Sequence, residues 1–457
     1  MDKYLISFIL LCFAFPSVAE EKNKLIVCEN GLEMLDWDLE FLSQAQHSVE
    51  ALVCFFGGSP AQRLLKAIET RLEEVPDLQV HLLASPVFLL TADWSLLEHL
   101  QQRFPSHFHI EFHTQIVKLL PDMTTIDNHV KLFIVDETYY SAGGTNCEEH
   151  HCSEGTYPPP KKTTSELTTD ILFPAGMRDQ DIVGKGPLAA QLRTFFFQLY
   201  ALWGDYNKTK YLQEDPNLFN QNIHYFDVTG QQPYVERFEH SDRIRELGEK
   251  SIRVILGGPQ QATSNAVTQE YIRLIQNAQE EIILSHLYFF PTASIFQALL
   301  DAVNRGVKLT LITNGLGDGS CEGAKLFAWA NRMSYVPMFY GATFYFWDAW
   351  KAQGRTVRNT TIYEYNVPDV LLHKKTMLVD HRYFVVGSYN LGMKSDHGDY
   401  ELILVIDSEK VAEDVLQIHK VDVEHSRQVS LQEACSWYFH PFISYWGELQ
   451  RRFNGFM

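Results

Sequence analysis

The sequence lacks an excess of basic residues. Its 457 residues include 38 Lys and Arg against 57 Asp and Glu, which gives a formal net charge of −19. A protein that grips long nucleic acid usually carries a basic stripe, because phosphate neutralisation supplies much of the affinity. The charge therefore argues against a processive or duplex-binding nuclease, and we expect no stable nucleic-acid partner. It leaves short single strands open as substrates.

Long apolar runs are absent beyond the first residues. Lys3 precedes an apolar run over residues 5–15, and small residues follow it at 17–19. The run is too short to span a bilayer and is typical of a secretory signal peptide that is cleaved after about Ala19. We therefore expect a secreted or extracytoplasmic protein that is soluble after cleavage.

Cysteine is scarce, and the cysteines beyond residue 19 are widely spaced. Such spacing does not define a disulfide scaffold, and a large core does not depend on one. Cys147 and Cys152 are close enough to close a small loop, so they form either a disulfide or two buried thiols. The segment 148–151 between them carries Glu and His, but its crowding is unlike the usual spacing of zinc ligands. We predict no metal there.

What the sequence does contain is one motif twice. The pattern H-x-K-x4-D begins at His129 and again at His373, 244 positions later, and each copy continues to a small-residue turn that ends in asparagine. The matched residues are His129 and His373, Lys131 and Lys375, Asp136 and Asp380, and Asn146 and Asn390. Similar segments precede the motifs from Ala45 and Ala278, so the repeat is a duplication rather than a chance match.

Each half of the duplication predicts an α/β layered fold. Helical patterns at 64–68 and 295–303 are followed by strand patterns at 80–83 and 307–312, and such alternation favours a mixed sheet flanked by helices. His and Lys of each motif, at positions i and i+2, leave the same face of a strand. The predicted divisions are a signal peptide at 1–19, a first half at 20–205, a linker or cap at 206–248, and a second half at 249–457.

Two histidines and two lysines from duplicated elements can form one phosphate pocket. A neutral imidazole can attack phosphorus while a protonated one donates to the leaving oxygen, so cleavage would pass through a covalent intermediate. Lys131 and Lys375 would stabilise the charge on the non-bridging oxygens, and Asn146, Asn390 and Ser388 would donate hydrogen bonds to them. The scheme requires no metal or other cofactor, and it neither requires nor forbids stimulation by calcium.

A nucleophilic histidine also needs an acceptor on its far nitrogen, which fixes the tautomer. Asp170 and Glu401 each open an apolar strand downstream of a motif, and we predict that they orient the histidines. Asp136 and Asp380 lie seven residues past their histidines, an odd spacing on a strand. We expect both to be structural, anchoring backbone or a cross-half ion pair.

The paired motifs, each followed by G-[GS]-x-N, resemble the phospholipase D superfamily. The resemblance covers both halves, including the segments 178–179 and 288–291. It implies a pseudo-twofold pseudo-dimer within one chain, with His129 as the nucleophile and His373 as the general acid. One departure is Gly144, where the second copy has serine, so one hydroxyl is absent on that side. We expect the protein to be a monomer.

The resemblance further implies a phosphodiesterase of the phospholipase D type. We expect it to hydrolyse glycerophospholipids such as phosphatidylcholine to phosphatidic acid through a phosphohistidine, and to transfer the phosphatidyl group to added alcohols. Its substrate would lie at a membrane surface that the protein touches transiently, with Trp347 and Trp350 as candidates for lipid contact. An exported single-strand nuclease and a phosphatidyl transferase of the cardiolipin synthase type are the alternatives.

Overall fold

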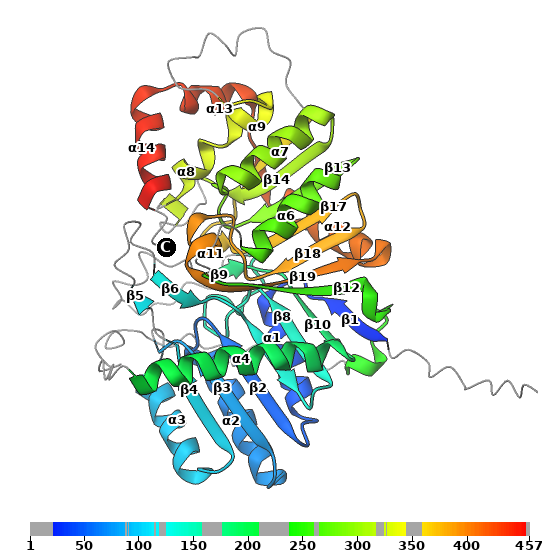
Figure 1. The fold of residues 1–457 in the computed structure, drawn as a ribbon, viewed down its shortest axis with the longest axis vertical. Helices are drawn as coiled ribbons and strands as arrows, with labels where there is room; N and C mark the ends of the chain where they lie inside the picture. Colours follow the sequence, from blue (N-terminus) through cyan, green and yellow to red (C-terminus); the bar gives the residue numbers. More distant parts are fainter. Residues whose placement is uncertain are drawn as a thin grey trace, which may run out of the picture.

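The computed structural model describes residues 22–86, 89, 91–113, 116–117, 125–157, 176–209, 237–259, 265–316, 324–325, 327–343 and 359–453. It confirms the predicted architecture, because two mixed sheets flanked by helices are stacked along the long axis of the molecule (Figure 1). No helix within these ranges has the length and apolar character needed to cross a membrane.

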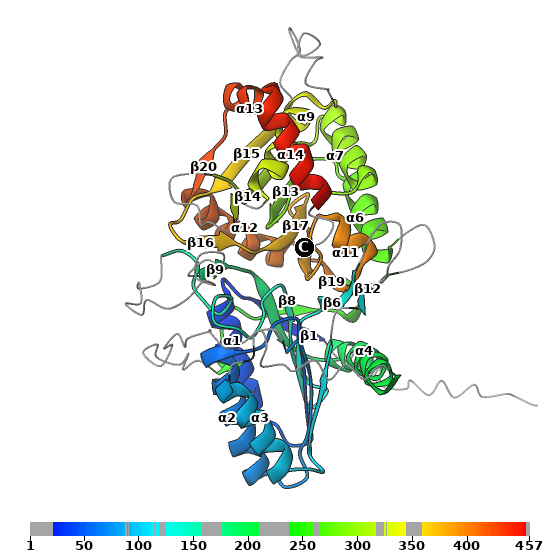
Figure 2. The same cartoon turned by 90° about the vertical axis from the view of Figure 1, so that its left-hand side faces the viewer.

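The first sheet has eight strands in the order β11-β1-β10-β8-β7-β2-β3-β4. Helices α1, α2 and α3 cover one face of it, and the long helix α4 covers the other (Figure 2). The elements of this half are β1 (Asn23–Val27), α1 (Gly31–Leu42), β2 (Ser48–Val53), α2 (Gly58–Glu74), β3 (Gln79–Ala84), α3 (Thr91–Arg103), β4 (Phe108–Phe112), β5 (Ile116–Val117), β6 (Thr125–Asn128), β7 (Leu132–Val135), β8 (Tyr139–Gly143), β9 (Gly176–Arg178), β10 (Asp181–Lys185), α4 (Leu188–Thr209) and β11 (Arg245–Leu247).

The second sheet follows the order β20-β15-β14-β13-β17-β18-β19-β6-β5, and β12 also pairs with β19. The elements of this half are β12 (Ile252–Gly257), α6 (Ala266–Asn277), β13 (Glu281–His286), α7 (Ala293–Arg305), β14 (Lys308–Asn314), α8 (Ala328–Arg332), α9 (Tyr335–Tyr340), β15 (Thr360–Tyr365), β16 (Val370–Leu372), β17 (Lys375–Val379), β18 (Tyr383–Gly387), α11 (Met393–His397), β19 (Asp399–Asp407), α12 (Glu409–Glu424), β20 (Ser426–Gln428), α13 (Leu431–Tyr438) and α14 (Pro441–Phe453).

The duplication is visible in the strand order. The run β10-β8-β7-β2-β3-β4 of the first sheet matches β19-β18-β17-β13-β14-β15 of the second, and in both runs the last three strands are parallel. The limits of the two halves stay a prediction. Both ends of the predicted linker, 206–248, belong to regular elements of the first half. Residues 206–209 are the last residues of α4, and β11, near the other end, pairs with β1.

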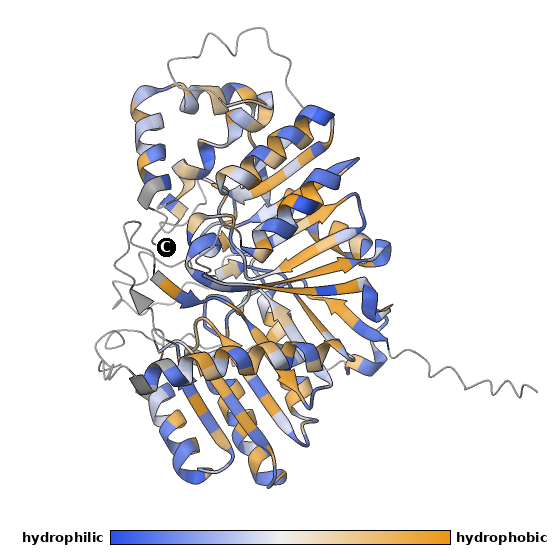
Figure 3. Ribbon diagram, in the orientation of Figure 1, coloured by the Kyte–Doolittle hydropathy of each residue, from blue (hydrophilic) through white to orange (hydrophobic). Residues whose placement is uncertain are grey.

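The motif strand β7 is buried on both faces. Its alternate residues Phe133 and Val135 join the core of the first half, whereas Leu132 and Ile134 join a third cluster that also contains residues of β18, β19 and α12 from the second half. Because side chains alternate along a strand, one apolar run can serve two cores. Figure 3 shows these central strands as mostly hydrophobic and the outer helices as striped.

Two short pairings join the halves next to the motifs. β6 runs parallel to the start of β19, and β9 runs parallel to β16. A buried ion network crosses the same boundary, since Asp422 of α12 accepts from Arg178 Nε at 2.9 Å and from the ammonium of Lys374. Removing one partner of such a group would leave an unpaired buried charge at the boundary between the halves.

The aspartate of each motif forms a hairpin turn. Asp136 and Asp380 have φ values of 55° and 52°, a left-handed conformation that Asp tolerates better than most residues. The carboxylate of Asp136 accepts from the backbone N–H groups of residues 46–48 at 2.7–2.8 Å. That of Asp380 accepts from residues 279–281 at 2.8–3.0 Å. Each aspartate thus ties its turn to the start of the neighbouring strand.

Candidate active site

Each motif histidine is anchored by the opposite half. His129 follows β6, and its backbone N–H donates to the carbonyl of Tyr400 at 2.9 Å. His373 follows β16, and its backbone N–H donates to the carbonyl of Arg178 at 2.8 Å. The strand pairings between the halves therefore continue directly into the two histidines.

The side chain of His129 is held by Glu401. Nδ1 lies 3.1 Å from both carboxylate oxygens of Glu401 and 2.9 Å from the carbonyl oxygen of Ser388. All three are acceptors, so Nδ1 carries the proton and Nε2 keeps its lone pair. This is the tautomer that a nucleophile at phosphorus requires.

His373 has a carboxylate in the matching place. Its Nδ1 lies 2.5 Å from Asp179 Oδ2, and Asp179 is fully buried. We predicted Asp170 as this partner, but Asp170 lies outside the described residues. In the structure, the first half supplies Asp179 to His373. The position of Asp179 in the strand register matches that of Glu401. Asp179 lies two residues before the residue that pairs with Gly143, and Glu401 lies two residues before the residue that pairs with Gly387.

The two carboxylates are supported differently. Glu401 receives hydrogen bonds from the hydroxyls of Ser388 and Ser395, the latter at 2.5 Å. The hydroxyl of Ser388, which we predicted to bind phosphate, is thus directed to Glu401, and it also accepts from Leu402 N–H at 3.0 Å. On the other side Gly144 supplies no hydroxyl, and the carboxylate of Asp179 packs against it.

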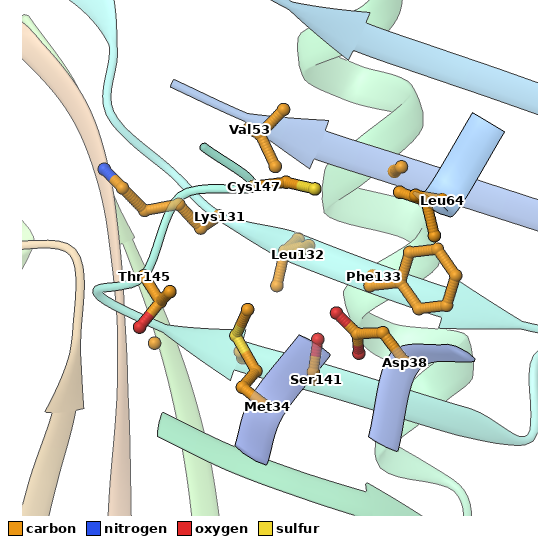
Figure 4. A pocket seen from close by; sticks show the side chains of 13 residues that line it. Met34, Asp38, Val53, Leu64, Lys131, Leu132, Phe133, Ser141, Thr145 and Cys147 are labelled. Atoms are coloured by element: carbon orange, nitrogen blue, oxygen red, sulfur yellow. The ribbon is translucent and has the colours of Figure 1, made fainter. Parts of the chain in front are cut away.

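The two lysines share one arrangement. The ammonium groups of Lys131 and Lys375 each donate to the carbonyl of the histidine two residues earlier at 2.5 Å. Lys375 Nζ also lies 3.1 Å from Nε2 of His373. Figure 4 shows the stem of Lys131 beside a small internal cavity, with its ammonium pointing away from the cavity.

The asparagines that end the turns differ in their contacts. Asn146 Oδ1 accepts from the backbone N–H of Phe55 at 3.0 Å, and its Nδ2 lies 3.0 Å from Nε2 of His151. Oδ1 of Asn390 is buried and has no hydrogen-bond partner within the described part of the chain. The predicted phosphate-binding role of the two amides stays a prediction.

Electrostatics link the two motifs into one site. Burial, partly offset by Glu401, lowers the pKa of His129 to about 4, and Lys131 and Lys375 add to this. Burial and Lys375 hold the pKa of His373 well below its usual range, against the opposing effect of Asp179. Both imidazoles are therefore neutral in the empty site at pH 7. An anionic phosphodiester between them would favour protonation of one.

Burial also lowers the pKa of Lys375 to about 8, with Asp179 opposing the shift and Lys131 adding to it. The ammonium form still predominates at pH 7. The effect of each lysine on groups of the other motif shows that the two H-x-K pairs lie within electrostatic range of one another.

One group of potential metal ligands occurs within the described ranges. Ligand atoms of His129, Asp399 and Glu401 lie within 4.8 Å of one another. Lys394 lies 3.7 Å from Asp399, and Glu401 already accepts from His129 and two serines. A cation and hydrogen bonds thus already offset the charge that a metal ion would neutralise.

The cysteine-flanked segment has neither a disulfide nor a zinc-like ligand set. Cys147 and Cys152 are free, buried thiols, which is the second of the two states that the sequence left open. His150 Nδ1 and His151 Nδ1 contact different oxygens of Glu148 at 2.6 and 2.8 Å. The ring of His151 lies against that of His373, with centroids 4.7 Å apart.

Comparison with known proteins relates the second half of the chain to a known family. A family described as "Cardiolipin synthase, PLD-like domain" matches residues 271–422. Cardiolipin synthase A of Buchnera aphidicola subsp. Schizaphis graminum is 28% identical over 177 residues, 39% of this chain and 31% of the relative. Cardiolipin synthase A of Proteus mirabilis is 28% identical over 192 residues, 42% of this chain and 34% of the relative. The chain thus spans about a third of the length of the curated relatives it matches.

A solved structure covers nearly the whole fold. The phosphatidylserine synthase of Haemophilus influenzae Rd KW20 has a TM-score of 0.61 at 14% identity, over 94% of each chain. This likeness shows a shared fold. The match to the PLD-like domain and the duplicated motifs support membership of the phospholipase D superfamily. Enzymes of this superfamily use a catalytic histidine and need no cofactor.

The comparisons contradict the expected secreted or extracytoplasmic location. The relatives are named as bacterial cardiolipin synthases and a phosphatidylserine synthase, and none of those reported above is named as a secreted phospholipase D. Residues 1–19, on which that expectation rested, lie outside the described part of the chain.

A side chain at residue 144 should disturb Asp179. An ideal Cβ placed on Gly144 lies 2.7 Å from Asp179 Oδ1, closer than real contacts of this kind. We predict that Gly144→Ser lowers kcat for bis(p-nitrophenyl) phosphate about 100-fold, because His373 loses its fixed orientation. Gly248→Ser is the control, since a Cβ there meets nothing within 4 Å. Equal kcat values for the two variants would show that Asp179 does not need this space.

Proposed function

We propose that the protein is a phosphatidyl transferase, which moves a phosphatidyl group from one phospholipid to the alcohol of an acceptor. The observation that carries the proposal is the crosswise pair of histidines, each with Nδ1 bonded to a carboxylate of the opposite half. The names of the relatives, cardiolipin synthases and a phosphatidylserine synthase, favour transfer over the hydrolysis that we expected from the sequence.

In the first step, Nε2 of His129 would attack phosphorus and form a P–N bond. The bond from phosphorus to the head-group oxygen breaks, and that oxygen takes a proton from His373. Lys131 and Lys375 would stabilise the negative charge on the non-bridging oxygens in the five-coordinate transition state. Since His373 is neutral in the empty site, it would take up its proton when the anionic substrate binds.

In the second step, His373 would remove the proton from the hydroxyl of the acceptor. The acceptor oxygen attacks phosphorus, the P–N bond to His129 breaks, and a new phosphodiester leaves. Water in place of the alcohol would give phosphatidic acid. The rings are well shielded, with 13% of the His129 side chain and 8% of the His373 side chain exposed, which restricts water and favours an acceptor that binds as a lipid.

The transfer reaction can be measured directly. Vesicles of phosphatidylglycerol, which is both donor and acceptor, should yield cardiolipin and free glycerol, with less phosphatidic acid than cardiolipin. His129→Ala should lower the rate by at least about 1000-fold, because it removes the nucleophile. His381→Ala, at an exposed turn with 49% of its side chain accessible, should retain the rate. Phosphatidic acid as the main product would identify a hydrolase, and cleavage of oligonucleotides alone would identify a nuclease.

A lipid substrate requires contact with a membrane surface, and α14 presents a suitable face. Phe442, Tyr445 and Trp446 are 74%, 69% and 46% exposed, and their i, i+3, i+4 spacing places them on one side of the helix. Phenylalanine, tyrosine and tryptophan insert readily into the bilayer interface. The predicted contacts Trp347 and Trp350 lie outside the described residues.

In both views the carboxyl end of α14 lies beside α11 (Figures 1 and 2). α11 carries Lys394, which is 3.7 Å from Asp399, and the exposed Met393. Phe442, Tyr445 and Trp446 belong to the first turns of α14, at the end of the helix away from α11 (Figures 1 and 2).

Replacing Phe442, Tyr445 and Trp446 together with serine should weaken binding to phospholipid vesicles about tenfold or more, because apolar area no longer enters the interface. Turnover of the water-soluble bis(p-nitrophenyl) phosphate should stay unchanged. Tyr157→Ser removes an aromatic ring that is 69% exposed at another place and serves as the control in a flotation assay. Unaltered vesicle binding by the triple variant would exclude α14 as the membrane contact.

A further inference from the structure

His151 is a third imidazole at the site, and the proposed mechanism does not use it. It is 3% exposed, and its ring packs edge to face against that of His373, at 4.7 Å between centroids and an interplanar angle of 85°. It lies in the segment between Cys147 and Cys152, after the turn that ends in Asn146. The equivalent position, five residues after Asn390, is Ser395, which carries a hydroxyl in place of an imidazole and donates it to Glu401.

The contacts of Asn146 fix the orientation of its amide. Its Oδ1 accepts from the backbone N–H of Phe55 at 3.0 Å, so its other terminal atom must be the nitrogen donor. That nitrogen lies 3.0 Å from Nε2 of His151, which therefore acts as the acceptor. One hydrogen of the Asn146 amide is thus used by His151, and the second has no hydrogen-bond acceptor within the described part of the chain.

The same contacts fix the tautomer of His151. Since Nε2 accepts, the proton lies on Nδ1, which donates to Glu148 Oε2 at 2.8 Å. Glu148 is buried and is also bonded to His150. The two imidazoles lower the pKa of this carboxyl against the effect of burial, so it stays ionised. The chain Glu148–His151–Asn146 is therefore complete only while His151 is neutral.

We propose that His151 is a positioning residue that holds the Asn146 amide toward the phosphate and supports the ring of His373. The proposal rests on the phosphodiester chemistry above and deepens it, because it makes the two sides of the pseudo-twofold site unequal. The His373 side has a clamped amide donor, whereas on the His129 side Oδ1 of Asn390 has no hydrogen-bond partner within the described part of the chain.

Protonation of His151 would break the chain. Below its pKa, Nε2 becomes a donor that faces the donor nitrogen of Asn146, and the new charge faces His373. Burial lowers the pKa of His151, while Glu148 and Asp179 oppose the shift and Lys375 adds to it. Two further titratable groups lie next to this chain: His150, bonded to the other oxygen of Glu148, and the thiol of Cys152, which donates to the backbone carbonyl of Asn146 at 3.4 Å. Activity should therefore fall on the acid side through His151 as well as through His129.

Three variants separate positioning from general packing. His151→Leu fills the space but cannot accept, and should lower kcat for bis(p-nitrophenyl) phosphate about 30-fold, within the loss expected for a misplaced transition-state donor. His151→Gln can accept through its amide oxygen and should recover most of that loss. His150→Leu removes the neighbouring imidazole, which contacts the other oxygen of Glu148, and should change kcat less than threefold.

The pH profile and a double variant supply readouts that a packing role would not move. As the pH falls, kcat/KM of the wild type should decline with the steepness of more than one protonation. In His151→Gln the decline should correspond to a single protonation. Adding Asn146→Ala to His151→Leu should cost clearly less than the sum of the two single losses, because the two residues share one hydrogen bond. Additive losses, or an unchanged acid limb in His151→Gln, would overturn the proposal.

Binding of inorganic phosphate, measured by calorimetry, tests the inference apart from turnover. His151→Leu should weaken phosphate binding at least fivefold, and His150→Leu should not. If the wild type transfers no phosphatidyl group but this difference persists, the proposed function fails and the role of His151 stands. If the wild type is active and the two leucine variants bind phosphate equally, the role of His151 is wrong. Thermal unfolding of each variant controls for misfolding.

Discussion

The site depends on one reciprocal constraint: each motif histidine is held by the half to which it does not belong. The backbone N–H of His129 donates to the carbonyl of Tyr400, and its ring Nδ1 contacts the carboxylate of Glu401. His373 makes the same two contacts with the carbonyl of Arg178 and the carboxylate of Asp179. In both cases the two groups are consecutive in sequence and come from a strand that pairs across the boundary or from the residue after it. Neither histidine is oriented unless the halves are docked, so folding and assembly of the site are one event.

The duplication does not make the two sides equal. Glu401 is long enough to receive two serine hydroxyls as well as His129, whereas the shorter Asp179 packs against Gly144 and leaves no room for a hydroxyl. The Asp179 side also carries His151, whose ring packs against that of His373. A symmetric pocket could bind phosphate but would not decide which histidine attacks. These differences give the two histidines distinct surroundings, as a two-step displacement requires.

Much of this could be predicted from the sequence, because the motif spacing and the alternation of strands and helices are local patterns. The turn aspartates were recognisable from their odd spacing. Asp179 was not, because the connection before it is long and Asp170 opens an apolar segment much as Glu401 does. Only the strand register, which depends on pairing between distant segments, shows that Asp179 lies two positions before the partner of Gly143. The contact between His151 and His373 could not be predicted for a similar reason, because no local sequence pattern indicates it.

The central claim is that one site spans both halves, with His129 as the nucleophile and His373 as its acid and base. It is tested most directly by locating the phosphoryl group in His373→Ala after reaction with a p-nitrophenyl phosphodiester. That leaving group needs no proton, so the first step should proceed, while the second step, which needs a base, should stall. Peptide mapping should find the adduct on His129 and none in His129→Ala. An adduct on another residue, or rapid turnover by His373→Ala, would contradict the account.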